Sequence, residues 1–165
     1  MLSEKARDQI RRATTVLQII VLALCMGVVV FGIVAALQNS NKQQSFNTNV
    51  NIPVLAASVP MFFAGFVVPR LMPNRAALPG GQPLDPDPQV AEVLRVFSAI
   101  QTSTIVSCAM FEGTAFLNLV FYLLNAELVH AAVGGLCCLC ILAQFPTYDR
   151  MEQRIEEQLR RQRED

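Results

Sequence analysis

The sequence predicts an all-α fold: a four-helix transmembrane bundle with a cytoplasmic C-terminal amphipathic helix. Three observations support this prediction. Only 16% of the 165 residues are charged, whereas soluble domains average about 25%, and the mean hydropathy is +0.40. The apolar residues gather into four long blocks, each close to the roughly 20 residues that a spanning helix needs. Nearly all Lys and Arg residues fall in segments that this fold places on one side of the membrane.

Residues 1–15 are polar and mixed in charge, and we expect a cytoplasmic N-terminal segment here. Ser3 could cap a helix that runs directly into the first span, residues 16–37. A cleaved signal peptide is the alternative, but its apolar core is only about 7–15 residues long, so we favour a membrane anchor. Gly32 and Ala36 form a pair of small residues four apart. Such a pair either lets another helix approach closely or reflects ordinary membrane-helix composition.

The second span, residues 53–72, follows an Asn/Gln-rich loop and contains several prolines. Pro53 suits the first turn of a helix, where its missing N–H is not needed. Pro60 lies inside the span and is expected to kink it, which membrane helices tolerate when neighbouring groups bond to the freed carbonyl. A purely structural kink would explain Pro60 equally well. The span is expected to end at Pro69, Arg70 and Pro73.

A Pro/Gly-rich cytoplasmic linker, residues 73–92, comes next, with five prolines and a Gly-Gly pair. Its two aspartates, Asp85 and Asp87, raise the question of a metal site. The Asp-Pro-Asp-Pro run lacks the ligand number and spacing of a calcium loop. We therefore predict a stiff turn and no metal.

The third and fourth spans are expected at residues 100–124 and 128–145, which completes a membrane domain over residues 16–146. An amphipathic approach precedes the third span, so residues 90–124 could form one helix that projects beyond the bilayer. The break between the two spans is only three residues long. These spans should therefore form a tight antiparallel hairpin, and Pro146 should end the fourth span.

Residues 147–165 are predicted to form a cytoplasmic helical tail, with Thr147 as its cap. Its apolar residues are spaced four apart, at Met151, Ile155 and Leu159. Glu156 and Glu157 each lie four residues before an arginine, which favours a solvated helix. The narrow apolar stripe leaves two alternatives open: contact with an anionic membrane surface, or with a partner helix.

The distribution of basic residues predicts the orientation, because cytoplasmic loops carry an excess of Lys and Arg. All but one of the 13 Lys and Arg residues lie in the N-terminal segment, in the linker with its flanks, and in the tail. The exception is Lys42, between the first two spans. We therefore expect a multi-pass protein of the cell (inner) membrane with both termini cytoplasmic.

One acid, Glu112, lies close to the centre of the third span. An ionised carboxylate at the bilayer midplane costs about 2.5–3.5 kcal/mol on insertion scales, so an acid at this depth is a functional-site hypothesis. A low-dielectric surrounding favours the neutral form, and we expect Glu112 to be protonated. No Lys or Arg lies at matching depth in another span. The expected role is therefore donation of a hydrogen bond, for example to a carbonyl freed by Pro60.

The residues around Glu112 indicate a helix contact. Positions three or four apart share its face of the helix, namely Gln101, Thr104, Cys108, Ala115 and Leu119. Ala109 and Gly113 form a second pair of small residues beside this face. We expect Glu112 to point into a helix contact rather than at lipid.

The run TSTIVSCAMFEGTAFLNLV also resembles the second helix of the c subunit of rotary ATP synthases. That helix carries its ion-binding Glu in an Ala-x-x-Glu-x-x-Ala setting, after a start that contains Thr or Ser. The matching positions are Thr102, Ile105, Ala109, Glu112, Ala115, Phe116 and Leu119. The resemblance covers residues 102–120, one helix of four, and the preceding span lacks the Gly-x-Gly-x-Gly repeat of that family. It implies that Glu112 would be a proton carrier.

The five cysteines all lie inside apolar blocks, so the sequence indicates no extracellular disulfide framework. Cys137 and Cys140 have C-x-x-C spacing, but zinc would require thiolates inside hydrocarbon and no second pair lies nearby. We interpret them, with Cys138, as small packing residues. His130, near the outer end of the fourth span, is expected at the membrane interface.

The sequence contains no catalytic motif, so we expect no enzyme, no cofactor and no metal. A net charge of zero gives no basic field for nucleic acid. We expect a small polytopic membrane protein that acts as a non-catalytic subunit, scaffold or assembly partner. Its expected partners are the lipid bilayer and either a protein partner or further copies in a homo-oligomer. The alternatives are proton or cation translocation through Glu112, and a sensor whose tail recruits a cytoplasmic partner.

Overall fold

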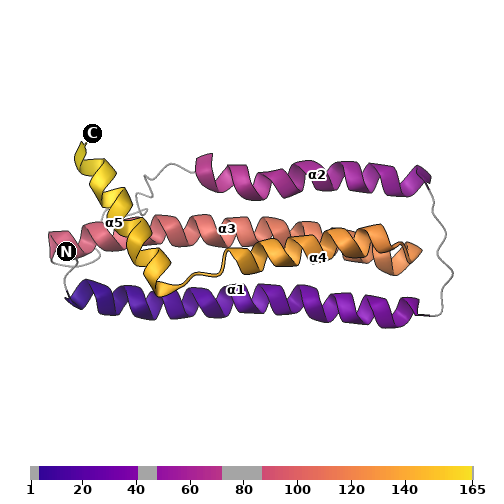
Figure 1. The fold of residues 1–165 in the computed structure, drawn as a ribbon, viewed down its shortest axis with the longest axis horizontal. Helices are drawn as coiled ribbons and strands as arrows, with labels where there is room; N and C mark the ends of the chain where they lie inside the picture. The colour runs from indigo at the N-terminus through magenta and orange to yellow at the C-terminus, as the bar shows by residue number, and fades with distance from the viewer. Residues whose placement is uncertain (1–3, 41–47, 72–86, 165) are drawn as a thin grey trace.

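The computed structural model describes residues 4–40, 48–71 and 87–164, and this part of the chain is entirely helical, without strands. The helices are α1 (Glu4–Asn39), α2 (Thr48–Leu71), α3 (Pro88–Asn125), α4 (Leu128–Ala143) and α5 (Tyr148–Glu164). Figure 1 shows α1 to α4 lying along the long axis of the molecule, with α5 crossing one end. The predicted all-α fold is confirmed.

Three helices are long and apolar enough to cross a membrane: α1, α3 and residues 52–71 of α2. The fourth is shorter than predicted, because α4 has 16 residues and is only about 24 Å long at 1.5 Å per residue. A bend of 70° separates α4 from α5, and the two together would make a fourth candidate span. The structure thus supports three to four spanning helices.

The predicted boundaries of the second span differ from the structure. Helix α2 begins at Thr48, so Pro53 lies inside the helix rather than in its first turn, and Pro69 does not end it. Proline is compatible with helical φ and lacks only the N–H. In a membrane helix the carbonyl that it frees can be satisfied from a neighbouring helix, and α3 does this for Pro69, as described below.

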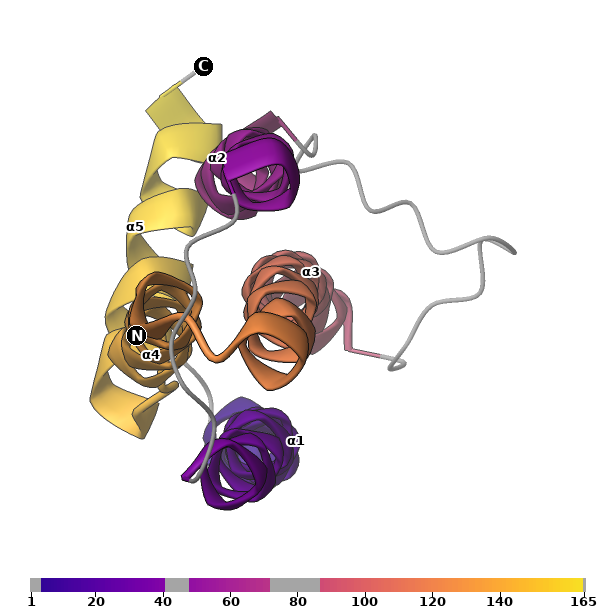
Figure 2. The same ribbon diagram turned by 90° about the vertical axis from the view of Figure 1, so that its right-hand side faces the viewer.

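Helix α3 is the centre of the bundle, and Figure 2 shows α1, α2 and α4 around it. As expected, the segment before the third span is continuous with it: α3 has 38 residues and is about 57 Å long. The end of the predicted linker, from Pro88 to residue 92, therefore belongs to a helix. The rest of that linker, with Asp85, lies outside the described residues, while Asp87 directly precedes α3.

The predicted hairpin between α3 and α4 is present, and its connection is only Ala126 and Glu127. Ala126 has a φ of 58°, a left-handed conformation that often ends helices. Its N–H donates to the carbonyl of Tyr122 at 2.8 Å, and the side-chain amide of Asn39 donates to the same oxygen. The connection is therefore bonded to both α3 and the end of α1.

The outer surface of the bundle is apolar where the sequence predicts spans. Large apolar side chains that are exposed occur in residues 16–37 of α1, in α2, at the end of α3 and in α4. None of the exposed large apolar side chains lies in the first 12 residues of α1 or in α5, among the described side chains. This distribution fits a membrane solvent around α1 to α4 and water around the remaining end.

Helix α5 packs on the start of α1 and α3 instead of standing alone. Met151 and Ile155 are buried and Leu159 packs against them. The core of this end contains residues of all three helices, namely Ala6, Ile10, Val90, Val93, Phe97, Met151 and Ile155. An ion pair of 3.1 Å between Arg7 and Glu152 joins α1 to α5. The chain itself thus covers Met151 and Ile155 and part of Leu159 in the apolar stripe of the tail.

The basic residues gather at this same end. Every described Lys and Arg lies near the start of α1 or α3, near the end of α2, or in α5, and these segments meet at one end of the bundle in Figure 1. Lys42 and Arg75 lie outside the described residues. The bundle therefore has one end that is rich in charged residues of both signs, and a long apolar body.

Candidate functional site

Glu112 lies in the contact between α1 and α3. A Cβ atom added at Gly27 of α1 would lie 3.7 Å from its Oε1 atom. Gly27 is near the centre of the first apolar block and Glu112 is near the centre of the third. Two helices thus independently place this carboxyl at mid-depth.

The carboxyl of Glu112 is half-buried and has no hydrogen bond or ion pair to any described residue. The expected bond to a carbonyl freed by Pro60 does not form. Pro60 is exposed on α2, whereas Glu112 faces α1. The buried neighbour Phe111 contacts α2 through the rings of Phe62 and Phe66.

The small residues proposed as helix contacts fall into two groups. Thr104, Cys108 and Ala115 are buried. Gly32 lies against Leu119, because a Cβ atom added at Gly32 would be 3.7 Å from Cδ1 of Leu119. The second group is exposed on the outside of the bundle: Ala36, Ala109 and Gly113. On α1 it is Ala35 that is buried, one residue and about 100° away from Ala36.

Gly113 lies on the side of α3 away from α4, and the exposed Ala109 precedes it by one turn. Ala115 and Leu119 of α3 face Gly134 of α4, and at 100° per residue Gly113 projects from the opposite side. Figure 2 shows α1, α2 and α4 around α3, with no described helix on this side. We call the side of α3 that carries Ala109 and Gly113 the open side.

Glu112 lies between the open side and the side that faces α4, about 60° around α3 from Ala109 and about 20° from Leu119. On α1, Cys25 contacts α4 through Cys138, and Gly27 is two residues, about 200°, around the helix from Cys25. Because the carboxyl of Glu112 reaches Gly27, it lies on the side of α1 away from α4. A helix that packed on Ala109 and Gly113 would therefore come close to this carboxyl.

Ser107 of α3 makes a bond that the sequence analysis missed. Its hydroxyl donates to the carbonyl of Gly65 at 2.5 Å, and Gly65 is the residue four before Pro69, whose carbonyl a proline leaves without its helical donor. A Cβ atom at Gly65 would lie 2.8 Å from the ring of Phe111. The Gly-x-x-x-Pro spacing in the second span was the signal for this close contact.

A second polar cluster joins α2, α3 and α4. The amide nitrogen of Asn118 donates to Ser58 Oγ at 2.8 Å, and its oxygen lies 3.0 Å from Nδ1 of His130. All three side chains are buried. His130 is therefore inside the bundle rather than at the interface, because its ring has a polar partner there. The sequence signal that could have predicted this cluster is Asn118, a polar residue six positions after Glu112 in the same span.

The cysteines are free thiols, and two of them meet across α1 and α4: Cys25 Sγ lies 3.3 Å from Cys138 Sγ. Adjacent thiols of the CCLC run point to different sides, as expected for a helix, with Cys137 buried and Cys138 half-buried. Among the described residues, no group of three or more His, Cys, Asp or Glu is placed to hold a metal ion.

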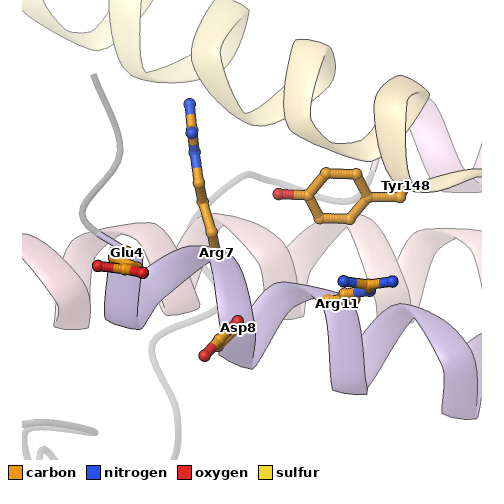
Figure 3. Close-up of a pocket in the computed structure, with 5 residues that line it drawn as sticks. All are labelled: Glu4, Arg7, Asp8, Arg11 and Tyr148. Atoms are coloured by element: carbon orange, nitrogen blue, oxygen red, sulfur yellow. The ribbon is translucent and has the colours of Figure 1, made fainter.

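The charged end of the bundle contains a cavity of about 380 Å³, lined by Glu4, Arg7, Asp8, Arg11 and Tyr148. Figure 3 shows Tyr148 extending from α5 over α1, beside the side chains of Arg7 and Arg11. Burial, and then the nearby Glu152 carboxylate with its hydrogen bond to the phenol, raise the pKa of Tyr148; Arg7 and Arg11 oppose this shift.

Comparison of this chain with models of protein families, with curated proteins and with solved structures finds no match.

Proposed function

We propose that this protein is a non-catalytic subunit of a membrane complex, and that the open side of α3 receives a transmembrane helix of its partner. The observation that carries the proposal is the state of Glu112, which is at mid-depth, half-buried and without a bonded partner among the described residues. In a bilayer core, an unsatisfied polar group costs several kcal/mol. A backbone carbonyl of a partner helix would accept the proton of the neutral carboxyl.

The small residues beside Glu112 supply the space for such a helix. Interfaces between membrane helices are enriched in small residues four apart, since these let the two backbones approach closely. Ala109 and Gly113 have this spacing and are exposed. A Cβ atom at Gly113 would meet only Met61 Cε, at 4.0 Å. The partner helix would therefore lie on α3 between α1 and α2, with Glu112 at its edge.

The proposal includes a topology in which α1 to α4 cross the inner membrane and both termini are cytoplasmic. The turn after α4 supports a fourth crossing despite the short helix. Gln18 Nε2 donates to the carbonyl of Pro146 at 2.8 Å, and Gln18 lies near the start of the first apolar block. Helix α4 and this turn thus cover the same depth as that block. The basic end would face the cytoplasm.

The test is the mass of the protein extracted in mild detergent, for the native chain and for three variants. We expect a complex larger than one chain. Glu112→Leu should weaken association about 3- to 20-fold, which corresponds to the roughly 0.6–1.7 kcal/mol of a hydrogen bond between membrane helices. Glu112→Gln should retain association because it keeps a hydrogen-bonding group. Gly113→Leu should prevent close approach.

Gly135→Leu is the matched control, since an added Cβ atom at Gly135 meets nothing within 4 Å and the residue lies on α4. It should leave the mass unchanged. A native chain that is monomeric in both detergent and bilayers would contradict the proposal, and so would equal losses from Gly135→Leu and Gly113→Leu.

A second candidate function, proton or cation translocation, is favoured by the same unpaired carboxyl at mid-depth and by the c-subunit resemblance. The other polar side chains of the third span do not extend from Glu112 as a chain: Ser107 and Asn118 bond to α2 instead. Glu112→Gln separates the two functions. Proton flux into pH-loaded vesicles would vanish in this variant if Glu112 carries protons, whereas association would survive.

A further inference from the structure

The cavity at the charged end lies at the depth of lipid head groups in the proposed topology. Arg11 is five residues before Val16, where the first apolar block begins, so it lies about 7.5 Å outside the hydrocarbon. The head-group layer of a bilayer is about 5–8 Å thick on each side. Tyr148 is two residues after Pro146, whose carbonyl is bonded to Gln18 near the same boundary. Two sides of the cavity are thus at head-group level.

Only some of the charged side chains that line the cavity form an ion pair with a described residue. Arg7 is paired with Glu152, while Arg11, Asp8 and Glu4 have no ion pair to a described residue. Arg11 and Asp8 are three residues apart on one face of α1, and Asp8 is the more distant from the hydrocarbon. The cavity therefore presents the Arg11 cation near the hydrocarbon and the carboxylates of Asp8 and Glu4 about one and two turns further out, none of them paired with a described residue.

We propose that this cavity binds the head group of a zwitterionic aminophospholipid. Arg11 binds the phosphate, and Asp8 accepts hydrogen bonds from the primary ammonium group. The depth order matches the ligand, since the phosphate is attached to the glycerol at the hydrocarbon boundary and the ammonium is free to extend outward. A cavity of about 380 Å³ is at the small end of ligand sites, which suits a head group rather than a larger molecule.

The charges also select among lipids. An anionic lipid without an amine would leave Asp8 and Glu4 facing a negative group, which raises its energy. A choline head group carries a positive charge but no N–H, so it cannot donate to Asp8. A head group with a primary ammonium is the one that satisfies both Arg11 and Asp8 through charge-assisted hydrogen bonds.

The experiment is native mass spectrometry of the full chain in detergent with added phosphatidylethanolamine, phosphatidylcholine or phosphatidylglycerol of identical acyl chains. We expect the ethanolamine lipid to bind about tenfold more tightly than the other two. Arg11→Gln should reduce its binding about tenfold, and Arg11→Lys should restore part of it. Asp8→Asn should lower binding of the ethanolamine lipid to the level of the choline lipid.

Arg12→Gln is the matched control, because it removes the same charge at nearly the same depth and Arg12 does not line the cavity. It should leave binding unchanged. Equal binding of the three lipids, tighter binding of phosphatidylglycerol, or an equal loss in Arg12→Gln would overturn the proposal. A last arm adds soluble phosphoethanolamine: if it binds as tightly as the lipid, the ligand is a soluble molecule and the lipid assignment is wrong. These readouts use single chains, so they stand apart from the association test of Glu112.

Discussion

At the scale of single residues, a few polar bonds and glycine contacts join α3 to its neighbours, in addition to the apolar core. Ser107, Asn118 and Glu112 point to different neighbours: the first two have partners in α2 and α4, and the third meets Gly27 without a bond. Polar groups in hydrocarbon are stabilising only when they are paired. The unpaired one is thus the residue to which a function can be assigned.

Gly65 is expected to tolerate no side chain. In Gly65→Ala the added methyl would lie 2.8 Å from the Phe111 ring, whose contacts with Phe62 and Phe66 hold it in place. We expect a loss of about 1–3 kcal/mol in the free energy of unfolding, as for other overpacked cores. The measurement is unfolding in mixed micelles. Gly135→Ala, which meets nothing, should be neutral, and Phe111→Leu should recover part of the loss in the double variant.

Tyr148 should titrate above the ordinary tyrosine value of about 10, since burial and the Glu152 carboxylate raise its pKa. A raised pKa in the folded state means that the neutral phenol contributes stability below pH 10, and that this contribution is lost as the pH rises through the folded pKa. The measurement is phenolate absorbance in a Tyr122→Phe background, where Tyr148 is the remaining tyrosine. A midpoint at or below about 10 would contradict the expected shift.

At the scale of helices, the apolar blocks of the sequence predicted the helices well but not their ends. The 3.6-residue repeat and block length identify a span, whereas its ends depend on contacts that no single segment contains. Pro69 continues the helix since Ser107, far away in sequence, bonds to the freed carbonyl of Gly65.

The candidate site around Glu112 was also predicted only in part from the sequence. Glu112 was identified because an acid in a span is rare. The side to which it points required the rotation of α3 relative to α1, which follows from packing around the whole helix. His130 shows the same limit, because its burial depends on Asn118 of a different helix.

The packing of α1 against α4 can be tested with the thiol pair Cys25 and Cys138. In a variant that keeps only these two cysteines, a membrane-permeable oxidant should form a disulfide, since their sulfur atoms are 3.3 Å apart. Counting the free thiols after denaturation, with a polyethylene-glycol maleimide, measures the reaction. A variant with only Cys25 and Cys140 is the control, because Cys140 lies about 200° around α4 from Cys138. Equal oxidation of the two variants would contradict the predicted register.

At the scale of the whole molecule, one continuous set of helices has a part whose surface suits lipid and a part whose surface suits water. The body of α1 to α4 exposes large apolar side chains, while the end formed by α5 with the first turns of α1 and α3 buries its apolar residues and exposes charges. Helices α1 and α3 run through both parts, so these two helices connect the apolar body directly to the charged end. The apolar residues under α5 belong to the same core cluster as those of the membrane part, but they lie at its end, so α5 should open without the membrane part.

Ile155 tests this independence, since it is fully buried where α5 meets the core of α1 and α3. In Ile155→Asp, loss of the buried side chain is worth about 1.5–3 kcal/mol before the cost of burying a carboxylate is added, so opening of α5 should become at least about tenfold more frequent. Hydrogen exchange should then accelerate in α5 and in the first turns of α1 and α3, and remain slow around Phe111 and Asn118. Gln153→Asp, at an exposed position of the same helix, should change neither region. If exchange at the start of α1 were unaffected by Ile155→Asp, α5 would not be packed on it, and the tail would again be free to bind a membrane surface or a partner.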